Sequence, residues 1–220
     1  MKIQLALDRM TMEEAIQITG QVQPFVDWIE VGTSLIKEFG MDSVRALRSR
    51  FPDKCLVADV KTFDNAAYEF DMCFSAGADV ATVMGAAPLV TIETCIEVAA
   101  KHGKQVMIDL LHTPEAQLQA LATYEEVVFC VHVSKDEQEK RDRQQSADQL
   151  PHMLKRFDGR KKKLALAGGI NLDSLPSLIR ARPDILIIGT AITRATDPAD
   201  AARTIQEFLN SSQKGENSHA

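Results

Sequence analysis

Apolar and polar residues alternate along the chain in two rhythms. Short apolar runs are typical of strands, and they cover residues 3–7, 28–32, 55–59, 80–84, 105–110, 127–133, 163–167 and 185–189. Between them, apolar residues recur every three or four positions, as in amphipathic helices, for example over 12–22, 42–51, 91–101 and 201–209. The pattern therefore predicts a strand-and-helix unit that repeats through the chain.

Several predicted helices follow a residue that can accept hydrogen bonds from the free backbone N–H groups of the first helical turn. Thr11, Asp42, Asp173 and Asp197 occupy this position, and Pro198 follows Asp197 at the first helical residue. These start signals separate the helices from the strands before them.

A strand followed by a helix, repeated through 220 residues, predicts an α/β protein with a single (β/α)₈ TIM barrel. The strands are almost continuously apolar, as in a parallel sheet buried on both faces. A doubly wound open sheet is the weaker alternative, because units of similar size close into a ring more naturally than they spread. We expect a catalytic barrel over residues 1–209 and a disordered polar tail over 210–220.

Composition narrows the class of protein. The net charge of −6 argues against general binding to nucleic acid or acidic membranes. No apolar run approaches the ~20 residues of a membrane span, and we see no signal peptide. The cysteines lack the spacing of a disulfide framework or zinc site, which indicates buried thiols in a reducing compartment; they are Cys55, Cys73, Cys95 and Cys130. We therefore expect a cytoplasmic protein without nucleic-acid or membrane partners.

Polar residues and glycines collect at the carboxyl ends of the predicted strands, where barrels carry their active sites. In chain order they are Asp8, Glu30, Asp59, Lys61, Asp109, His132, Gly168, Gly169, Gly189 and Thr190. Each has an ordinary structural explanation when taken alone, such as a helix cap or a hydrogen-bonded histidine. Their convergence on one face of the barrel is the stronger indication of a site.

The acidic residues and the lysine suggest the chemistry. Glu30 and Asp59 lie on neighbouring predicted strands, and two carboxylates with substrate and water oxygens suit Mg²⁺. Lys61 beside them could stabilise an oxyanion on a substrate carbon skeleton. Asp8 or Asp64 could hold this lysine charged and oriented.

His132 and two glycine-rich turns complete the predicted site. His132 could move protons near neutral pH. The turns at 167–170 and 188–192 follow the last two strands, where barrels commonly bind phosphate through backbone N–H groups. The residues therefore predict a phosphosugar enzyme that passes through a metal-stabilised enediolate.

Several segments resemble the orotidine 5′-phosphate decarboxylase suprafamily over about residues 2–209. They read LALD (5–8), IEVGT (29–33), ADVKTFD (58–64), AGADVATVMG (76–85), IDL (108–110), VHV (131–133), AGGI (167–170) and IIGTAIT (187–193). The Asp-x-Lys-x-x-Asp pattern at 59–64 is the most specific of them. The branch that the chain most resembles is 3-hexulose-6-phosphate synthase, with 3-keto-L-gulonate-6-phosphate decarboxylase beside it.

The resemblance implies a (β/α)₈ barrel that works as a homodimer with shared active sites. Glu30 and Asp59 match the positions that would bind Mg²⁺, and Lys61 matches the residue that would steady the enediolate. Asp64 would reach into the site of the partner subunit. Other polar positions of the family site are matched here by Asp8, Asp109 and His132.

The two branches differ at a few positions. Asp109, Ala167 and Thr190 resemble the synthase, because the decarboxylase usually has Glu, Thr and Arg there. The segment after His132 lacks the usual glycines and departs from both branches, although Asp136 and Gln138 remain. Lys135 falls where the decarboxylase has an arginine, and Asn65 replaces a small residue after the Asp-x-Lys-x-x-Asp pattern. These departures leave the choice of sugar phosphate open.

The leading expectation is an aldehyde-lyase that joins formaldehyde to ribulose 5-phosphate, or runs the reverse cleavage, through a Mg²⁺-stabilised enediolate. The alternative is decarboxylation of 3-keto-L-gulonate 6-phosphate, which Lys135 favours as a substrate contact. A second alternative is a phosphosugar-binding barrel without turnover. The presence of Asp59, Lys61 and Asp64 together argues against it.

Overall fold

Eight parallel strands close into a barrel in sequence order, each paired with its chain neighbours and β8 with β1. The computed structural model describes residues 1–140 and 162–217, with side chains described as far as residue 212. The strands are β1 (Lys2–Leu7), β2 (Trp28–Val31), β3 (Cys55–Thr62), β4 (Val80–Met84), β5 (Gln105–Asp109), β6 (Val128–His132), β7 (Lys163–Ala167) and β8 (Ile185–Ile188). The prediction of a TIM barrel is confirmed.

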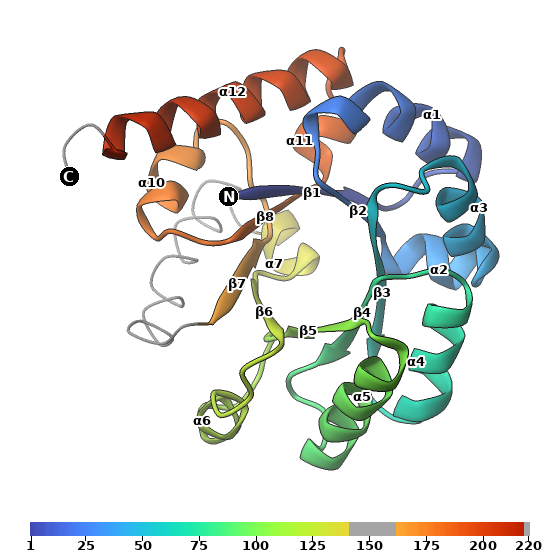
Figure 1. Ribbon diagram of the computed structural model, residues 1–220. Coiled ribbons are helices and arrows are strands. Elements are labelled where there is room, and N and C mark those ends of the chain that lie inside the picture. The colour runs from blue at the N-terminus through green and yellow to red at the C-terminus, as the bar shows by residue number, and fades with distance from the viewer. Residues whose placement is uncertain (141–161, 218–220) are drawn as a thin grey trace.

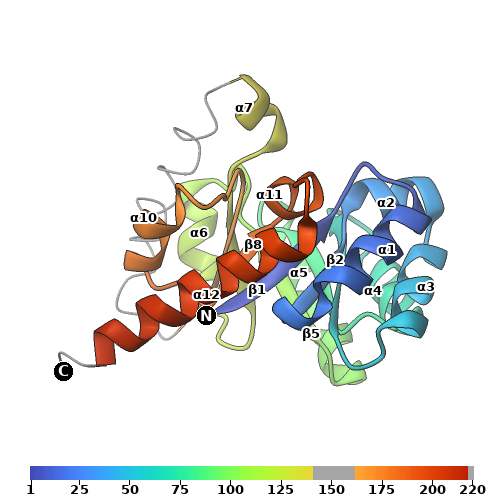
Figure 2. The same ribbon diagram turned by 90° about the horizontal axis from the view of Figure 1, so that it is seen from above.

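Among the described residues, most helices lie outside the ring of strands, whereas α7 (Lys135–Lys140) lies over the opening of the ring in this view (Figure 1). The helices are α1 (Met12–Val22), α2 (Thr33–Phe39), α3 (Asp42–Arg50), α4 (Ala66–Ser75), α5 (Leu89–His102), α6 (Glu115–Leu121), α7, α10 (Leu175–Arg180), α11 (Thr190–Thr193) and α12 (Pro198–Asn217), with a 3₁₀ helix η1 (Gln23–Phe25). Figure 2 shows α7 projecting beyond the other helices at one end of the molecule.

Two apolar clusters hold the barrel together, because alternate residues of each strand face inward and outward. The larger cluster packs the outward side chains of the strands against the helices. The smaller fills the barrel interior; its buried members are Trp28, Val57, Val80, Met107, Val128, Cys130, Ala165, Ala167, Ile185 and Ile187. Polar inward residues such as Glu30, Asp59 and Asp109 therefore end up buried at the top of an apolar interior.

Strand β3 is longer than the sequence predicts and is bulged at its end. Ala58 pairs with Ala81 and Thr62 with Val83, so the intervening segment of β3 has extra residues relative to β4. Lys61 takes a positive φ of 52° within this bulge. Such strained backbone is concentrated at functional sites in proteins, and here it lies beside the predicted lysine.

The helix-start predictions are confirmed at two positions and wrong at two. Thr11 forms a capping box with Glu14, and the Asp197 carboxylate accepts a hydrogen bond from the Asp200 N–H. Asp42 is instead the first residue of α3, where it pairs with Arg45. The residue before α10 is Ser174 rather than Asp173, because Ser174 exchanges hydrogen bonds with Asn171 in the preceding turn.

Helix α12 continues to Asn217, past the end predicted at residue 209. No proline interrupts this segment, and the hydroxyls of Ser211 and Ser212 donate to the carbonyl of Phe208 within it. The barrel boundary at 209 stays a prediction, and residues 218–220 of the predicted tail lie outside the described residues.

The four thiols are free. Cys73, Cys95 and Cys130 are buried as predicted, whereas Cys55 is only partly buried. Burial raises the pKa of Cys55 to about 11, so this thiol stays protonated at neutral pH. Across the described ranges, no helix is both long and apolar enough to cross a membrane.

Candidate active site

A cavity of about 770 Å³ opens at the carboxyl ends of the strands. This volume suits a small-molecule ligand. With the exception of Asp64, every predicted site residue lines it; these are Asp8, Glu30, Asp59, Lys61, Asp109, His132, Lys135, Gly168, Gly169, Gly189 and Thr190. Segments far apart in the sequence therefore meet in one cavity, as the strand ends predict.

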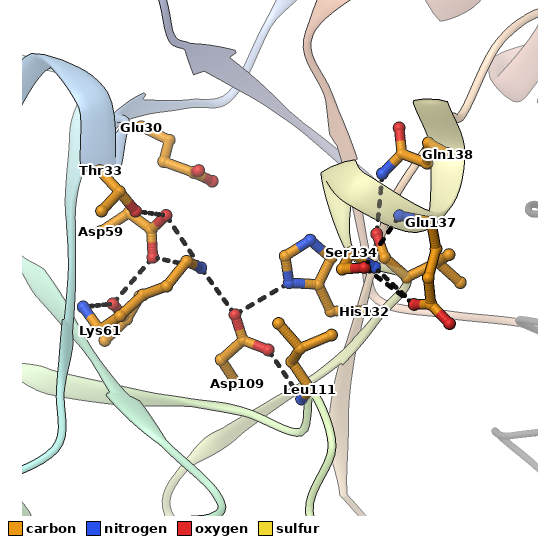
Figure 3. Close-up of polar contacts among 12 residues, drawn as sticks. Glu30, Thr33, Asp59, Lys61, Asp109, Leu111, His132, Ser134, Glu137 and Gln138 are labelled. Carbon is orange, nitrogen blue, oxygen red and sulfur yellow. Dashed lines mark hydrogen bonds and ion pairs between the residues drawn. The ribbon is translucent and has the colours of Figure 1, made fainter. Parts of the chain in front are cut away.

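Lys61 is the centre of the charged cluster in this cavity. Its Nζ donates to Asp109 Oδ2 at 2.7 Å and lies 3.1 Å from the carboxylate of Asp59 (Figure 3). Both carboxylates are buried, while the lysine side chain keeps 26% of its surface exposed toward the cavity. The ammonium group is thus fixed by two acids and still open to a ligand.

The charges in this cluster reinforce one another. Burial lowers the pKa of Lys61, but Asp59 and Asp109 raise it by more, so the net pKa lies above its ordinary value. Burial likewise raises the pKa of Asp109, but the hydrogen bonds from His132 and Lys61 and the charge of Lys61 hold it well below its usual range. At neutral pH the cluster therefore contains a cationic lysine and an ionised Asp109.

Asp109 also orients His132. The Nδ1 atom of His132 lies 2.9 Å from Asp109 Oδ2, and Asp109 Oδ1 accepts from the Leu111 N–H at 3.0 Å. Because an ionised carboxylate can only accept, Nδ1 carries the proton in this contact. The second ring nitrogen points away from Asp109 and is left to accept a proton (Figure 3).

Two threonines fix the Asp59 carboxylate. The Thr33 hydroxyl donates to Oδ2 at 2.7 Å, and the Thr82 hydroxyl donates to Oδ1 at 2.9 Å. Thr82 also accepts from the Lys61 N–H at 2.9 Å. A side-chain hydroxyl thus receives the backbone bond at the bulge of β3 and connects the backbone of Lys61 to the carboxylate of Asp59.

Glu30 is buried beside Asp59, on the neighbouring strand, as predicted. Burial raises the pKa of Glu30 well above its ordinary value, and the nearby charges of Asp59 and Asp8 raise it further. A bound cation would offset this repulsion between buried carboxylates. The donor set fits a hard divalent ion such as Mg²⁺, which commonly takes one or two carboxylates and completes its shell with substrate and water oxygens.

A site built from protein ligands alone is not seen. Within residues 1–140 and 162–217, no group of three or more His, Cys, Asp or Glu side chains could hold a metal ion. Glu30 and Asp59 would therefore need ligand or water oxygens to complete a Mg²⁺ shell.

The expectation that Asp8 or Asp64 orients Lys61 is wrong, since Asp59 and Asp109 occupy that role. The Asp8 carboxylate instead accepts from the backbone N–H and the hydroxyl of Ser34, at 3.0 and 2.7 Å. Gly32 permits this approach, because a Cβ atom at Gly32 would overlap the Asp8 carboxylate.

Asp64 lies outside the cavity. It is exposed, and its carboxylate accepts from the N–H of Asn65 at 2.7 Å. Asn65 has a positive φ of 57° just before α4, a conformation that asparagine adopts more readily than most residues. The last acid of the Asp-x-Lys-x-x-Asp pattern therefore lies between β3 and α4, outside the cavity of its own chain.

The glycine-rich turns line the opposite side of the cavity. Gly168 and Gly169 have φ values of 113° and 70°, and a Cβ atom at Gly168 would lie 2.6 Å from the Val133 carbonyl oxygen. Gly189 precedes α11, and Thr190 is its first residue. The first N–H groups of a helix have no partner within it, so this turn offers donors for an anionic group of a ligand.

The departure from the family pattern after His132 has a structural explanation. Ser134 and Glu137 form reciprocal hydrogen bonds typical of a capping box, which begins α7. Gln138 Nε2 donates to the Val133 carbonyl at 2.7 Å (Figure 3). The sequence after the histidine thus forms a short helix, and this helix carries Lys135 to the rim of the cavity.

Lys135 has an acidic neighbour at the rim. Its Nζ lies 3.9 Å from Glu139 Oε1, and the same oxygen accepts from Arg9 Nη1 at 2.8 Å. Arg194 Nη2 donates in turn to the Arg9 carbonyl at 3.1 Å. The rim therefore adds cations that the sequence did not single out.

Several residues that line the cavity are absent from the predicted site. Thr33 follows the predicted strand end, and its position after IEVG could have indicated a site role. Thr82 lies inside an apolar run, where threonine is an ordinary strand residue. Arg9 and Arg194 lie in loops with no local signal, and only the folded barrel brings them to one rim.

Comparison with known proteins agrees with this geometry. Residues 1–205 match the orotidine 5′-phosphate decarboxylase / HUMPS family. A 3-hexulose-6-phosphate synthase of Bacillus subtilis (strain 168) is 32% identical over 95% of this chain and 99% of its own length. A crystal structure of 3-hexulose-6-phosphate synthase from Salmonella typhimurium is 37% identical with a TM-score of 0.88, covering 96% of this chain and 99% of that one. A crystal structure of KGPDC from Streptococcus mutans is 26% identical with a TM-score of 0.81, and the match covers 95% of this chain and 97% of that one.

Proposed function

Because this chain belongs to the orotidine 5′-phosphate decarboxylase / HUMPS family, we propose that it is a 3-hexulose-6-phosphate synthase-like aldehyde-lyase. It would condense formaldehyde with ribulose 5-phosphate, or cleave the hexulose phosphate in reverse. The observation that carries the proposal is the position of Lys61, held between Asp59 and Asp109 and open to the cavity. A fixed ammonium group of this kind suits an enediolate, whose negative charge develops on oxygen.

His132 is the proposed base of the first step. Its free ring nitrogen would take a proton from C1 of ribulose 5-phosphate, and the electron pair would move onto the C2 oxygen to form the enediolate. Lys61 would stabilise that oxygen. Asp109, at 2.9 Å from Nδ1, would stabilise the imidazolium that results.

The second step forms the carbon–carbon bond. C1 of the enediolate attacks the formaldehyde carbon, the carbonyl at C2 reforms, and the aldehyde oxygen takes the proton from His132. Atoms and charge balance, and the histidine returns to its starting state. The reverse sequence cleaves the same bond and releases formaldehyde.

Glu30 and Asp59 are the residues that would hold Mg²⁺, and when bound the ion would supply positive charge for the negative charge that develops on the substrate. Thr33 and Thr82 would keep the Asp59 carboxylate oriented. Gly168, Gly169, Gly189 and Thr190 would bind the phosphate through backbone N–H groups.

Decarboxylation of 3-keto-L-gulonate 6-phosphate is the second candidate. Loss of CO₂ from this β-keto acid leaves an enediolate of the same kind, which Lys61 could stabilise and His132 could protonate. Lys135 favours it, because this cation lines the cavity and could contact the anionic substrate. Asp109, a carboxylate one methylene shorter than glutamate, favours the synthase.

We also propose that the active unit is a cytoplasmic homodimer in which Asp64 completes the partner's site. Asp64 is exposed and does not line the cavity of its own chain. Phe63, the residue before it, is an exposed apolar side chain, and the first turns of the packed helices α4 and α5 carry three more, namely Tyr68, Leu89 and Val90. Large exposed apolar residues that cluster in this way are typical of an interface.

One assay separates the candidates. Purified protein is given ribulose 5-phosphate with formaldehyde, or 3-keto-L-gulonate 6-phosphate, each with Mg²⁺ and with chelator. Hexulose phosphate formation supports the synthase, and CO₂ release supports the decarboxylase. If neither product forms and the C1 proton of ribulose 5-phosphate does not exchange with solvent, the chain binds phosphosugars without turnover and the proposal is wrong.

A further inference from the structure

Gln4 is a buried polar residue that the proposed mechanism does not use. It lies on β1, where it pairs in register with Trp28 of β2 and Ile187 of β8, both members of the apolar cluster inside the barrel. Its exposed fraction is 0%. An amide in such a layer is unfavourable unless its polar atoms find partners.

Only half of the Gln4 amide is satisfied. Its Nε2 donates to Glu30 Oε2, whereas Oε1 is buried without a hydrogen-bond partner. An apolar side chain of similar length would avoid an unpaired buried acceptor. Fold stability alone therefore does not account for glutamine at this position.

The contact with Glu30 gives the amide a purpose. Glu30 lies buried above the apolar layer, and within the described part of the chain Gln4 is the one side chain that donates a hydrogen bond to its carboxylate. Asp59, by comparison, is held by Thr33, Thr82 and Lys61. Without Gln4 the Glu30 carboxylate would have no fixed orientation from a donor.

The donor is also neutral, which matters for a metal ligand. A lysine or arginine at this place would pair with the carboxylate and compete with a bound cation. An amide occupies Oε2 and leaves the negative charge of the group in place. Partners of this kind orient metal ligands, and their loss typically weakens metal affinity ~10- to 100-fold.

We propose that Gln4 is a positioning residue that holds the Glu30 carboxylate in the orientation needed to bind Mg²⁺. This inference rests on the proposed metal role of Glu30 and Asp59. Gln4 would thus act through Glu30, without contact with the substrate.

The test compares Gln4→Met with the unchanged chain. Methionine keeps the length of the side chain and removes the donor. Mg²⁺ affinity is measured by titration calorimetry without substrate, and activity is measured as a function of Mg²⁺ concentration. We expect the dissociation constant to rise about 10- to 100-fold, while kcat at saturating Mg²⁺ stays within about threefold of the unchanged chain.

Two further variants keep the result interpretable. Gln4→Asn retains an amide but is too short to reach Glu30, so its Mg²⁺ affinity should fall by the same factor. This variant replaces Gln4→Met in the test if Gln4→Met does not fold. Val80→Ala removes volume from the same interior cluster; it should lower the melting temperature without changing Mg²⁺ affinity.

The outcomes are distinct. Unchanged Mg²⁺ affinity in a folded Gln4 variant would overturn the positioning role and leave the metal proposal intact. An equal loss of affinity in Val80→Ala would show that packing, and not the amide, matters. If the unchanged chain binds no Mg²⁺, the metal part of the proposed function fails, and this inference fails with it.

Discussion

The cavity has two groups of charged residues that differ in burial. The inner group, Asp59, Lys61 and Asp109, has side chains that are 9%, 26% and 4% exposed. The rim group, Arg9, Lys135 and Glu139, has side chains that are 60%, 38% and 50% exposed. Both groups contain ion pairs of ordinary length, so distance alone does not separate them.

Burial decides how much each group contributes. Removing one partner of a buried pair leaves a charge without compensation and costs about 3–5 kcal/mol, whereas an exposed pair contributes about 0–1 kcal/mol. The inner group is also held by the hydroxyls of Thr33 and Thr82, so it is organised before a ligand arrives. We infer that the inner group performs the chemistry and that the rim adjusts to the substrate.

The largest effect should come from Lys61→Ala. It removes the cation between Asp59 and Asp109 and the group proposed to stabilise the enediolate, so kcat should fall about 10²- to 10³-fold. Steady-state kinetics on the preferred substrate measure it. Lys101→Ala, at an exposed lysine near the end of α5, is the control and should leave kcat unchanged.

A fall in kcat of only a few-fold in Lys61→Ala would contradict the inference that the inner group performs the chemistry. It would mean that the inner group is a structural ion-pair network, with the chemistry located elsewhere in the cavity.

Metal removal should have the next largest effect. Chelation should abolish most activity, and Asp59→Asn should reproduce the loss, because Asp59 is one of the two proposed ligands. Asp79→Asn is a matched control: Asp79 also pairs with two cations, Arg48 and Lys104, but lies away from the cavity. It should lower the melting temperature and keep the response to Mg²⁺. Full activity in chelator would contradict the metal assignment.

The sequence predicts the barrel and most of the cavity for a simple physical reason. Parallel strands place their carboxyl ends at one face, so residues after each strand converge whatever their distance along the chain. That rule is enough to bring Glu30, Asp109 and Gly189 together. It requires only the order of the elements.

The partners of Lys61 could not be predicted in the same way. They depend on the bulge at the end of β3 and on the register between strands, and neither is visible in a local pattern. Asp64 is near the lysine along the chain, and Asp8 lies at the end of another strand of the barrel. In the folded chain, however, Asp8 accepts a hydrogen bond from Ser34 and Asp64 accepts one from Asn65. Gln4 gives no signal in the sequence, because one polar residue in an apolar strand is common.

Asp64 tests whether burial in one chain is a sufficient guide. It is exposed and outside its own cavity, so its burial alone predicts that a substitution of Asp64 has a small effect on activity. A shared dimer site predicts the opposite: Asp64→Ala should be inactive. Mixing it with inactive Lys61→Ala should restore about a quarter of the activity, because half of the dimers are hybrids with one intact site.

Subunit exchange is checked with differently tagged chains. No recovery despite exchange would count against a shared site. Recovery would show that Asp64 belongs with the inner group of a neighbouring subunit.

A smaller effect is expected from Lys135→Ala. As an exposed charge alone it would contribute little, but a contact with an anionic intermediate in a partly dehydrated cleft reaches about 1.5–3 kcal/mol. We expect kcat/KM to fall roughly 10- to 100-fold, with the fold and Mg²⁺ affinity unchanged. A kcat/KM within about twofold of that of the unchanged chain on both candidate substrates would show that Lys135 does not contribute to substrate binding or catalysis. It would also remove the main support for decarboxylation.

The smallest effect should belong to the pair of Arg9 and Glu139, which joins the loop after β1 to α7. At 2.8 Å the geometry is good, but both side chains are at least half exposed, so water and salt screen the attraction. In a double-mutant cycle of Arg9→Ala and Glu139→Gln, the coupling free energy should be about 0.2–1 kcal/mol for substrate binding. The coupling should also shrink as salt is added. A coupling as large as that of Lys61 with Asp109, and insensitive to salt, would show that the rim is closed and dry in the working enzyme, which would place Arg9 and Glu139 among the residues that organise the chemistry.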